Sequence, residues 1–311
     1  MMKFLVRRLV HTLIVLFGIS LIVFFCIRLT GDPAAAMFQG TGQPTKEALD
    51  QIRHALGLDK PLWEQYATFI GNMLSGNMGH SFRNNEPVFS LIAERMGATV
   101  SLAAGGVAVA LLIAFPVGIL SAVKRGGLMD MFGRIFSLAG ISFPNFWLAI
   151  MFILVFAVHL HWLPASGYNG PKYLILPSLS LGLILAGVLA RLIRSSMLDV
   201  LHQHYIRTAK AKGVAEWAII IRHALRNALI PTITFLGLQL GALLGGVVIL
   251  EQVFSWPGVG RLVLDAINDR DYPVVQGSVM FLSFLLMLVN LLVDISYGFI
   301  DPRIKLGRGR T

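Results

Sequence analysis

Charged side chains are scarce in this sequence of 311 residues. Only 14% of the residues are Asp, Glu, Lys or Arg, and 56% are hydrophobic, whereas about a quarter of the residues of a soluble domain are charged. This balance excludes an ordinary water-soluble protein. The net charge of +10 does not indicate nucleic acid as a partner, because the basic residues stand beside apolar runs rather than in a cluster with groove-reading elements.

Cysteine and the common catalytic motifs are also missing. Cys26 is the single cysteine, so neither an intrachain disulfide nor a cysteine-built metal site can form. The sequence contains no G-x-x-x-x-G-K-[ST] phosphate loop, no H-E-x-x-H and no G-x-S-x-G. His159 and His161 lack a nearby carboxylate or cysteine that would complete a metal site, and we interpret them as interfacial anchors. We expect no catalytic residue, metal or cofactor in this chain.

Long uncharged runs, in contrast, are abundant. About 20 apolar residues in a helix cross the ~30 Å hydrocarbon layer of a membrane. We predict an all-α polytopic bundle of six transmembrane helices, in which Pro116 and Pro144 kink two of the spans. The six runs, none containing Asp, Glu, Lys or Arg, are 9–27, 100–123, 135–158, 173–190, 227–250 and 274–293.

Basic residues indicate how the bundle is oriented. If both termini are cytoplasmic, 17 of the 26 Lys and Arg residues fall in cytoplasmic segments, and only Lys172, Arg261 and Arg270 fall in short outer loops. Lys and Arg accumulate on the cytoplasmic side of membrane proteins. We therefore predict an N-in, C-in protein with membrane lipid as its surroundings.

The chain divides into three predicted parts. Residues 1–97 contain the first span and an extracytoplasmic segment with two short amphipathic helices, the first capped by Thr45. We expect these helices to pack on the bundle, with substrate recognition as the alternative. Residues 98–300 form a five-helix core with a cytoplasmic loop at 195–230, and residues 301–311 form a basic cytoplasmic tail.

Glycines recur at four-residue spacing in the fifth span, at Gly237, Gly241 and Gly245. Small residues at this spacing let helix backbones approach closely in lipid. We predict a packing face here, and both packing within the subunit and a position at a subunit interface or pathway remain open.

The loop at 195–230 is the most informative segment. We predict two short helices, at 197–212 and from Ala215 onward, with Gly213 providing a left-handed break between them. Such a compact pair of helices suits docking into the groove of a partner protein, whereas a plain connector could be far shorter.

The same loop carries a family resemblance. It reads Tyr205-Ile-Arg-Thr-Ala-Lys-Ala-Lys-Gly213 and later Arg222-His-Ala-Leu-Arg-Asn-Ala-Leu-Ile-Pro231, which resembles the EAA loop of bacterial ABC importer permeases. The resemblance is strongest to the dipeptide, oligopeptide, glutathione and nickel branch, and residues 31–33, 56–62, 251–261 and 270–273 resemble that branch too. Arg207-Thr208 replace the Glu-Ala of the wider family, a variation common in the peptide branch.

The resemblance implies a type I ABC importer permease fold in the bacterial inner membrane, with peptide transport by alternating access. It implies as partners a homologous second permease subunit, two ABC ATPase subunits that bind ATP and Mg²⁺, and an extracytoplasmic solute-binding protein. The loop would then couple the chain to an ATPase subunit, through Arg207, Ala209, Gly213, Arg222 and Asn227. The substrate-binding residues stay unknown at this point.

Two other classes of protein are alternatives. A secondary transporter or channel working without ATPase partners would place several ionisable groups at the bilayer midplane and often shows an inverted repeat; the spans are nearly free of charge and show no repeat. A membrane-embedded enzyme would need a catalytic constellation, and none stands out.

Overall fold

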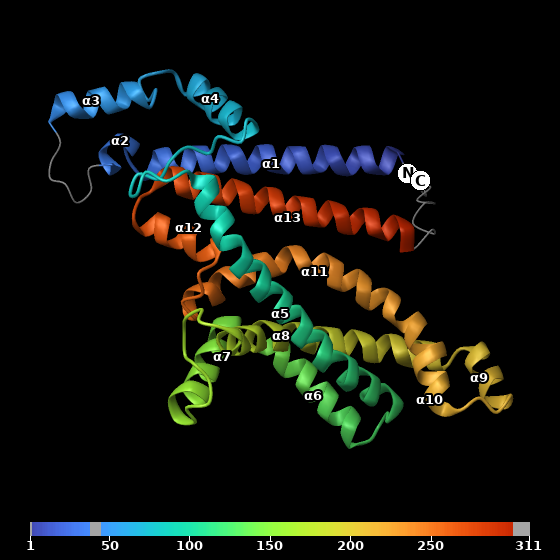
Figure 1. Cartoon of the computed structure of the whole chain (residues 1–311). Coiled ribbons are helices and arrows are strands. Elements are labelled where there is room, and N and C mark those ends of the chain that lie inside the picture. The colour runs from blue at the N-terminus through green and yellow to red at the C-terminus, as the bar shows by residue number, and fades with distance from the viewer. Residues whose placement is uncertain (1, 38–44, 301–311) are drawn as a thin grey trace. The chain divides into compact units, whose positions relative to one another are not determined.

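The computed structural model describes residues 2–37 and 45–300, so the predicted tail at 301–311 lies outside the described residues. The described residues are helices joined by turns, with a single isolated bridge between His80 and Pro87 (Figure 1). They group into two compact units, Met1–Gly97 with Gly258–Thr311, and Ala98–Pro257. Residues from Gly258 onward group with the N-terminal residues, and the predicted division into three parts stays a prediction.

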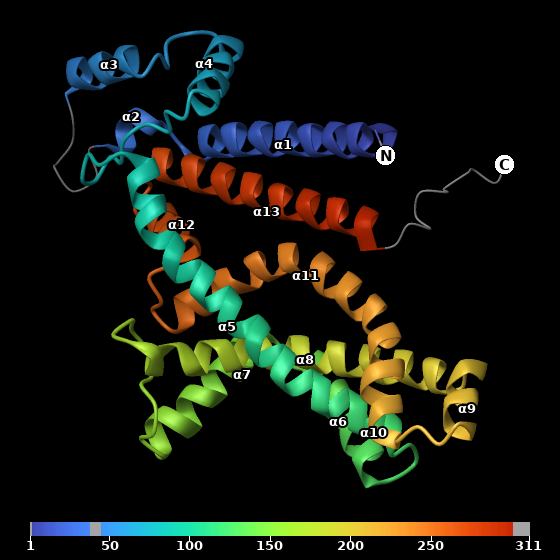
Figure 2. The ribbon, with the colours of Figure 1, turned by 45° about the vertical axis from the view of Figure 1, so that its right-hand side comes forward.

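The first unit is organised around two long helices. Its elements are α1 (Met2–Thr30), α2 (Pro33–Ala36), α3 (Lys46–Ala55), α4 (Leu62–Leu74), the beginning of α5 (Val88–Val123), α12 (Val259–Asn268) and α13 (Tyr272–Ile300). α1 packs along α13, and the start of α1 and the end of α13 lie at the same end of the pair (Figure 1, Figure 2). This antiparallel arrangement agrees with the predicted topology, in which both termini lie on one side of the membrane.

Both predicted amphipathic helices after the first span are present. Thr45 caps α3 as expected, since its hydroxyl accepts a hydrogen bond from the Ala48 N–H at 3.3 Å. α4 packs on α1 through Tyr66, whose hydroxyl lies 2.7 Å from the Ser20 hydroxyl and whose ring meets Phe24 edge-on at 5.2 Å. α4 therefore packs on α1.

The second unit is organised around α8. It contains the rest of α5, then α6 (Leu128–Ser142), α7 (Asn145–Phe152), a π-helical segment (Ile153–His159), α8 (Pro171–Leu201), α9 (His204–Ala211), α10 (Glu216–Ala218), a second π-helical segment (Ile219–Leu225) and α11 (Arg226–Val253). α8 contacts α6, α7 and α11. The helices around it approach closely at glycines: a Cβ atom on Gly187 would lie 3.1 Å from the Cα atom of Gly140, and one on Gly182 would lie 2.7 Å from the Gly106 carbonyl oxygen.

The predicted packing face on α11 has a mixed environment. Gly241 is buried and Gly237 is half-buried, while the surroundings of Gly245 lie outside the described side chains. The role of these glycines stays a prediction.

The third predicted span differs from expectation. Instead of one kinked helix, the chain forms two helical segments, Leu128–Ser142 and Asn145–His159, bent by 106° at the break. Phe143 is extended (φ −100°, ψ 134°) and Pro144 precedes the second segment. Proline disfavours helical geometry in the residue before it, so Pro144 ends the first segment rather than kinking it. The described residues contain five helices long and apolar enough to cross a membrane, or six if the bent pair is one span.

Candidate functional site

The predicted docking loop contains one separate short helix rather than two. α8 ends at Leu201 and α9 covers His204–Ala211, so the helix predicted at 197–212 is split. From Glu216 the chain stays helical through α10, the π-helical segment and α11 to Val253. The predicted second helix is thus the beginning of the fifth span. We refer to residues 202–227 as the α9 segment.

Gly213 terminates α9 in the conformation expected from the sequence. Its φ is +74°, a region that residues with a Cβ rarely adopt. The Gly213 N–H donates to the Lys210 carbonyl at 3.0 Å, and the Val214 N–H donates to the Ala209 carbonyl at 3.2 Å, the pattern of a Schellman cap. A Cβ on Gly213 would meet nothing within 4 Å, so the glycine serves the backbone turn rather than a tight contact.

One face of the α9 segment is anchored in the second unit. Ile206 is fully buried and belongs to the same core as Met197 and Ile219. The Asn227 side-chain amide donates to the Tyr205 hydroxyl at 2.9 Å, which ties the beginning of α11 to α9. These contacts attach α9 to the beginning of α11 and to the core of the second unit.

Other side chains of the α9 segment are exposed. Arg207 and Arg222 are exposed, and no ion pair joins either guanidinium to another part of the described chain. Trp217 is 71% exposed and Ile221 is 50% exposed. Exposed apolar side chains beside unpaired cations are compatible with a surface for a protein partner. Trp217 was not among the predicted site residues, although an aromatic residue in a basic loop was the available signal.

A buried carboxylate, also absent from the predicted site, lies close to this surface in the fold. Asp130, in the first turn of α6, is 2% exposed. It accepts hydrogen bonds from Arg194 Nε at 2.6 Å and from the Gly126 N–H at 2.9 Å, and Arg134 Nε lies at 3.7 Å. Because Arg194 belongs to the last two turns of α8, Asp130 fastens the turn between α5 and α6 to the end of the helix that leads into α9.

A second polar network closes the opposite end of α11. Glu251 is fully buried and accepts a hydrogen bond from the Thr99 hydroxyl at 2.7 Å. Trp256 Nε1 donates to the Ala98 carbonyl at 2.7 Å, and Tyr168 meets the Trp256 ring edge-on at 4.6 Å. The network fixes the end of α11 to α5, so it has a structural role within the second unit.

A small cavity of about 130 Å³ lies between α7, α8 and α11. Its wall is aliphatic except for the side-chain amides of Asn145 and Gln239. Amides in such a wall can donate and accept hydrogen bonds with a polar solute. Among the described residues, no group of three or more His, Cys, Asp or Glu side chains could hold a metal ion.

Sequence comparisons cover nearly the entire chain. Residues 114–306 match the family described as "Binding-protein-dependent transport system inner membrane component", and residues 1–103 match its N-terminal family. A putative peptide permease protein of Brucella suis is 40% identical over 98% of this chain and 100% of its own length. A glutathione transport system permease protein of Pectobacterium atrosepticum is 42% identical over 98% of this chain and 99% of its own length. A dipeptide transport system permease protein of Alkalihalophilus pseudofirmus is 39% identical over 98% of this chain and 100% of its own length.

A comparison with solved structures supports the same fold. The chain resembles the inward-facing methionine ABC transporter MetNI with a TM-score of 0.54 and 19% identity, covering 68% of this chain and 96% of that chain. The expected type I importer permease fold and the family resemblance are confirmed, and the alternative of an isolated secondary transporter or channel falls away. The chain belongs to the family of binding-protein-dependent transport system inner membrane components and is a multi-pass permease subunit of an ABC importer in the inner membrane.

Proposed function

We propose that this permease subunit carries small peptides, and that it forms the pathway together with a homologous second permease subunit. Relatives named as dipeptide, glutathione and putative peptide permeases align over 98% of this chain, and this similarity supports the proposal. A solute-binding protein would deliver the peptide to the extracytoplasmic side. Two ATPase subunits would bind ATP and Mg²⁺, since the sequence has no phosphate loop.

In this proposal the α9 segment couples ATP binding to the pathway. Closure of the ATPase subunits would displace α9, and the displacement would pass to α11 because Asn227 bonds to Tyr205 and Ile206 is buried in the core. Ala209 and Gly213 would shape the turn, while Arg207 and Arg222 would bind polar or acidic groups of the ATPase. The ATPase subunits can shift the equilibrium between the inward-facing and outward-facing states of the permease only by as much as their affinities for these two states differ.

Trp217 supplies a first test of this docking surface. Trp217→Ala is expected to weaken retention of the ATPase subunits at least about tenfold, because exposed aromatic residues often dominate the affinity of an interface. The measurement is the amount of ATPase subunit that stays with the tagged chain during size-exclusion chromatography. Trp63→Ala is the matched control, since Trp63 is 70% exposed on α4 of the extracytoplasmic segment. Equal retention in both variants would remove Trp217 from the interface.

Peptide uptake into proteoliposomes tests the proposed substrate. The complete complex, with its binding protein and internal ATP, is expected to accumulate labelled Ala-Ala-Ala, and unlabelled dipeptides and glutathione serve as competitors. Uptake should stop when ATP is omitted or when the binding protein is left out. A complex that hydrolyses ATP in response to its loaded binding protein, yet neither moves nor is inhibited by any of these peptides, would contradict the peptide assignment.

A further inference from the structure

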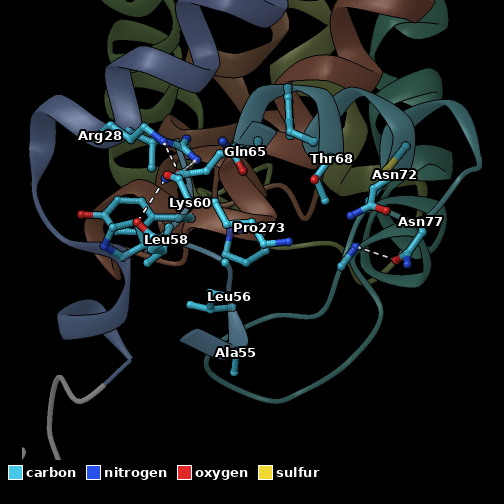
Figure 3. Close-up of a pocket in the computed structure, with 18 of the residues that line it drawn as sticks. Arg28, Ala55, Leu56, Leu58, Lys60, Gln65, Thr68, Asn72, Asn77 and Pro273 are labelled. Carbon is cyan, nitrogen blue, oxygen red and sulfur yellow. Dashed lines mark hydrogen bonds between the residues drawn. The ribbon is translucent and has the colours of Figure 1, made fainter. Parts of the chain in front are cut away.

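A cavity of about 400 Å³ lies within the first unit, where α3, α4 and the turn that joins them face the end of α1 and the beginning of α13 (Figure 3). This volume is within the range of small-molecule binding sites in proteins. Its wall combines apolar side chains such as Phe69 and Met73 with polar side chains that include Arg28, Asn72 and Asn77. The mechanism proposed for the α9 segment makes no use of this cavity.

Arg28 is held rigidly at the cavity wall. Gln65 accepts hydrogen bonds from Arg28 Nε at 3.1 Å and from Nη2 at 2.7 Å. The Gln65 amide is itself fixed, because it donates to the carbonyls of Leu58 at 3.1 Å and Lys60 at 2.7 Å (Figure 3). The guanidinium also stacks over the Phe24 ring at 3.4 Å. A cation fixed in this way loses little conformational entropy when a ligand binds.

Two of the five N–H groups of Arg28 remain available. Nε, one N–H of Nη2 and one N–H of Nη1 are engaged, the last with the Phe24 carbonyl at 3.1 Å. A guanidinium has five N–H donors, so one is left on each terminal nitrogen without an acceptor among the described residues. A carboxylate or phosphate commonly accepts from both terminal nitrogens of an arginine. The free donors therefore suit an oxyanion.

The charge of the cavity wall favours the same class of ligand. The described lining contains Arg28 and Lys60 but no Asp or Glu. Asp59, just outside the lining, is bonded to His54 at 2.7 Å, and this hydrogen bond holds the pKa of Asp59 below its usual range. No carboxylate lies within ion-pair distance of Arg28 in the described part of the chain. A half-buried cation without a counter-ion is costly, and an anionic ligand would relieve that cost.

We propose that this cavity is a binding site for a small molecule carrying a carboxylate or phosphate group, with the anionic group on Arg28. Asn77, across the cavity from Arg28 (Figure 3), can donate to another part of the ligand, since its side-chain oxygen accepts from the Gly79 N–H at 3.1 Å and its NH₂ group stays available. The apolar wall at Phe69 and Met73 takes the part of the ligand next to the anionic group. Two sources share this chemistry: the terminal carboxylate of a peptide, which rests on the proposed function, and the phosphate of an anionic lipid headgroup, which does not.

The test uses the intact complex in phosphatidylcholine nanodiscs, without binding protein or nucleotide. Calorimetry with Ala-Ala-Ala and with its C-terminal amide probes the peptide source, and native mass spectrometry after addition of phosphatidylglycerol probes the lipid source. Arg28→Gln is expected to weaken binding of the true ligand at least about tenfold, the loss typical of a removed charged hydrogen bond. Lys46→Gln, an exposed cation of α3 outside the lining, should change it less than about twofold.

The results distinguish a peptide ligand from a lipid ligand. Arg28-dependent binding of the free tripeptide but not of its amide assigns the peptide carboxylate, and Arg28-dependent retention of phosphatidylglycerol assigns the lipid. If Arg28→Gln disrupts the complex, Lys60→Gln replaces it, with an expected weakening of about threefold. If neither ligand shows binding that depends on Arg28 or Lys60, the proposed site is wrong. Peptide uptake measured in parallel keeps the proposals separate, because uptake that continues without Arg28-dependent binding leaves the proposed function standing.

Discussion

Gly213→Val is expected to reduce peptide uptake and binding-protein-stimulated ATP hydrolysis at least about tenfold. The reason is the backbone: Gly213 has a φ of +74°, and left-handed geometry costs residues with a Cβ roughly 1–2 kcal/mol, with β-branched residues the worst accommodated. The variant must abandon the Schellman cap, which releases the hydrogen bonds to Ala209 and Lys210 and redirects α9. Stimulated ATPase activity and uptake of the reconstituted complex provide the measurement.

Gly213→Asn is the matched control. Asparagine tolerates left-handed geometry far better than valine, and a Cβ at this position would meet no atom within 4 Å. We therefore expect the asparagine variant to keep most of its coupled activity. Equal loss in both variants would mean that the site rejects any side chain, for example by contact with an ATPase subunit, and the argument from backbone conformation would be wrong.

Asp130→Ala is expected to lower the apparent Tm of the complex markedly and to reduce coupled activity. Asp130 is 2% exposed and accepts from Arg194, whose own side chain is 22% exposed. Removal of one partner from a buried ion pair typically costs about 3–5 kcal/mol, because the other charge is left uncompensated. We expect the lower end of that range, since Arg194 reaches some solvent. Fluorescence-detected size exclusion after heating measures the Tm shift.

Arg134→Gln is the control for Asp130. Arg134 is 60% exposed and 3.7 Å from the same carboxylate, so its loss should cost less than about 1 kcal/mol. The double variant Asp130→Ala with Arg194→Leu should be less destabilised than the sum of the single variants, since the two residues form one interaction. If the destabilisation of the double variant equals the sum of the single variants, the 2.6 Å contact between Arg194 and Asp130 contributes no interaction energy.

Local features of the fold were predictable because their causes lie within a few residues. The length of each uncharged run determines whether a helix can span the membrane, and the structure contains apolar helices at each of the six predicted positions, with the third broken. Thr45 and Gly213 were predicted correctly because a cap and a left-handed turn are set by short-range backbone requirements.

Features that depend on distant partners were not predictable. The hydrogen bond between Arg194 and Asp130 joins residues 64 positions apart, and the cavity beside Arg28 brings together residues from 27 to 276. The break at Pro144 was misjudged for another reason: a proline inside an apolar run can kink a helix or end it. Pro116 lies inside the continuous α5, whereas Pro144 separates two segments, and the neighbouring packing decides between these outcomes.

The ATPase activity of the complex that co-purifies with a tag on this chain tests whether the chain is coupled to ATPase subunits. We expect ATPase subunits to co-purify with the native chain and loaded binding protein to stimulate their ATP hydrolysis. Arg207→Glu should abolish the stimulation, because it places a like charge against acidic groups of the ATPase. A tagged chain that purifies without any ATPase subunit and still moves peptide into vesicles would show that transport by this chain does not depend on an ATPase.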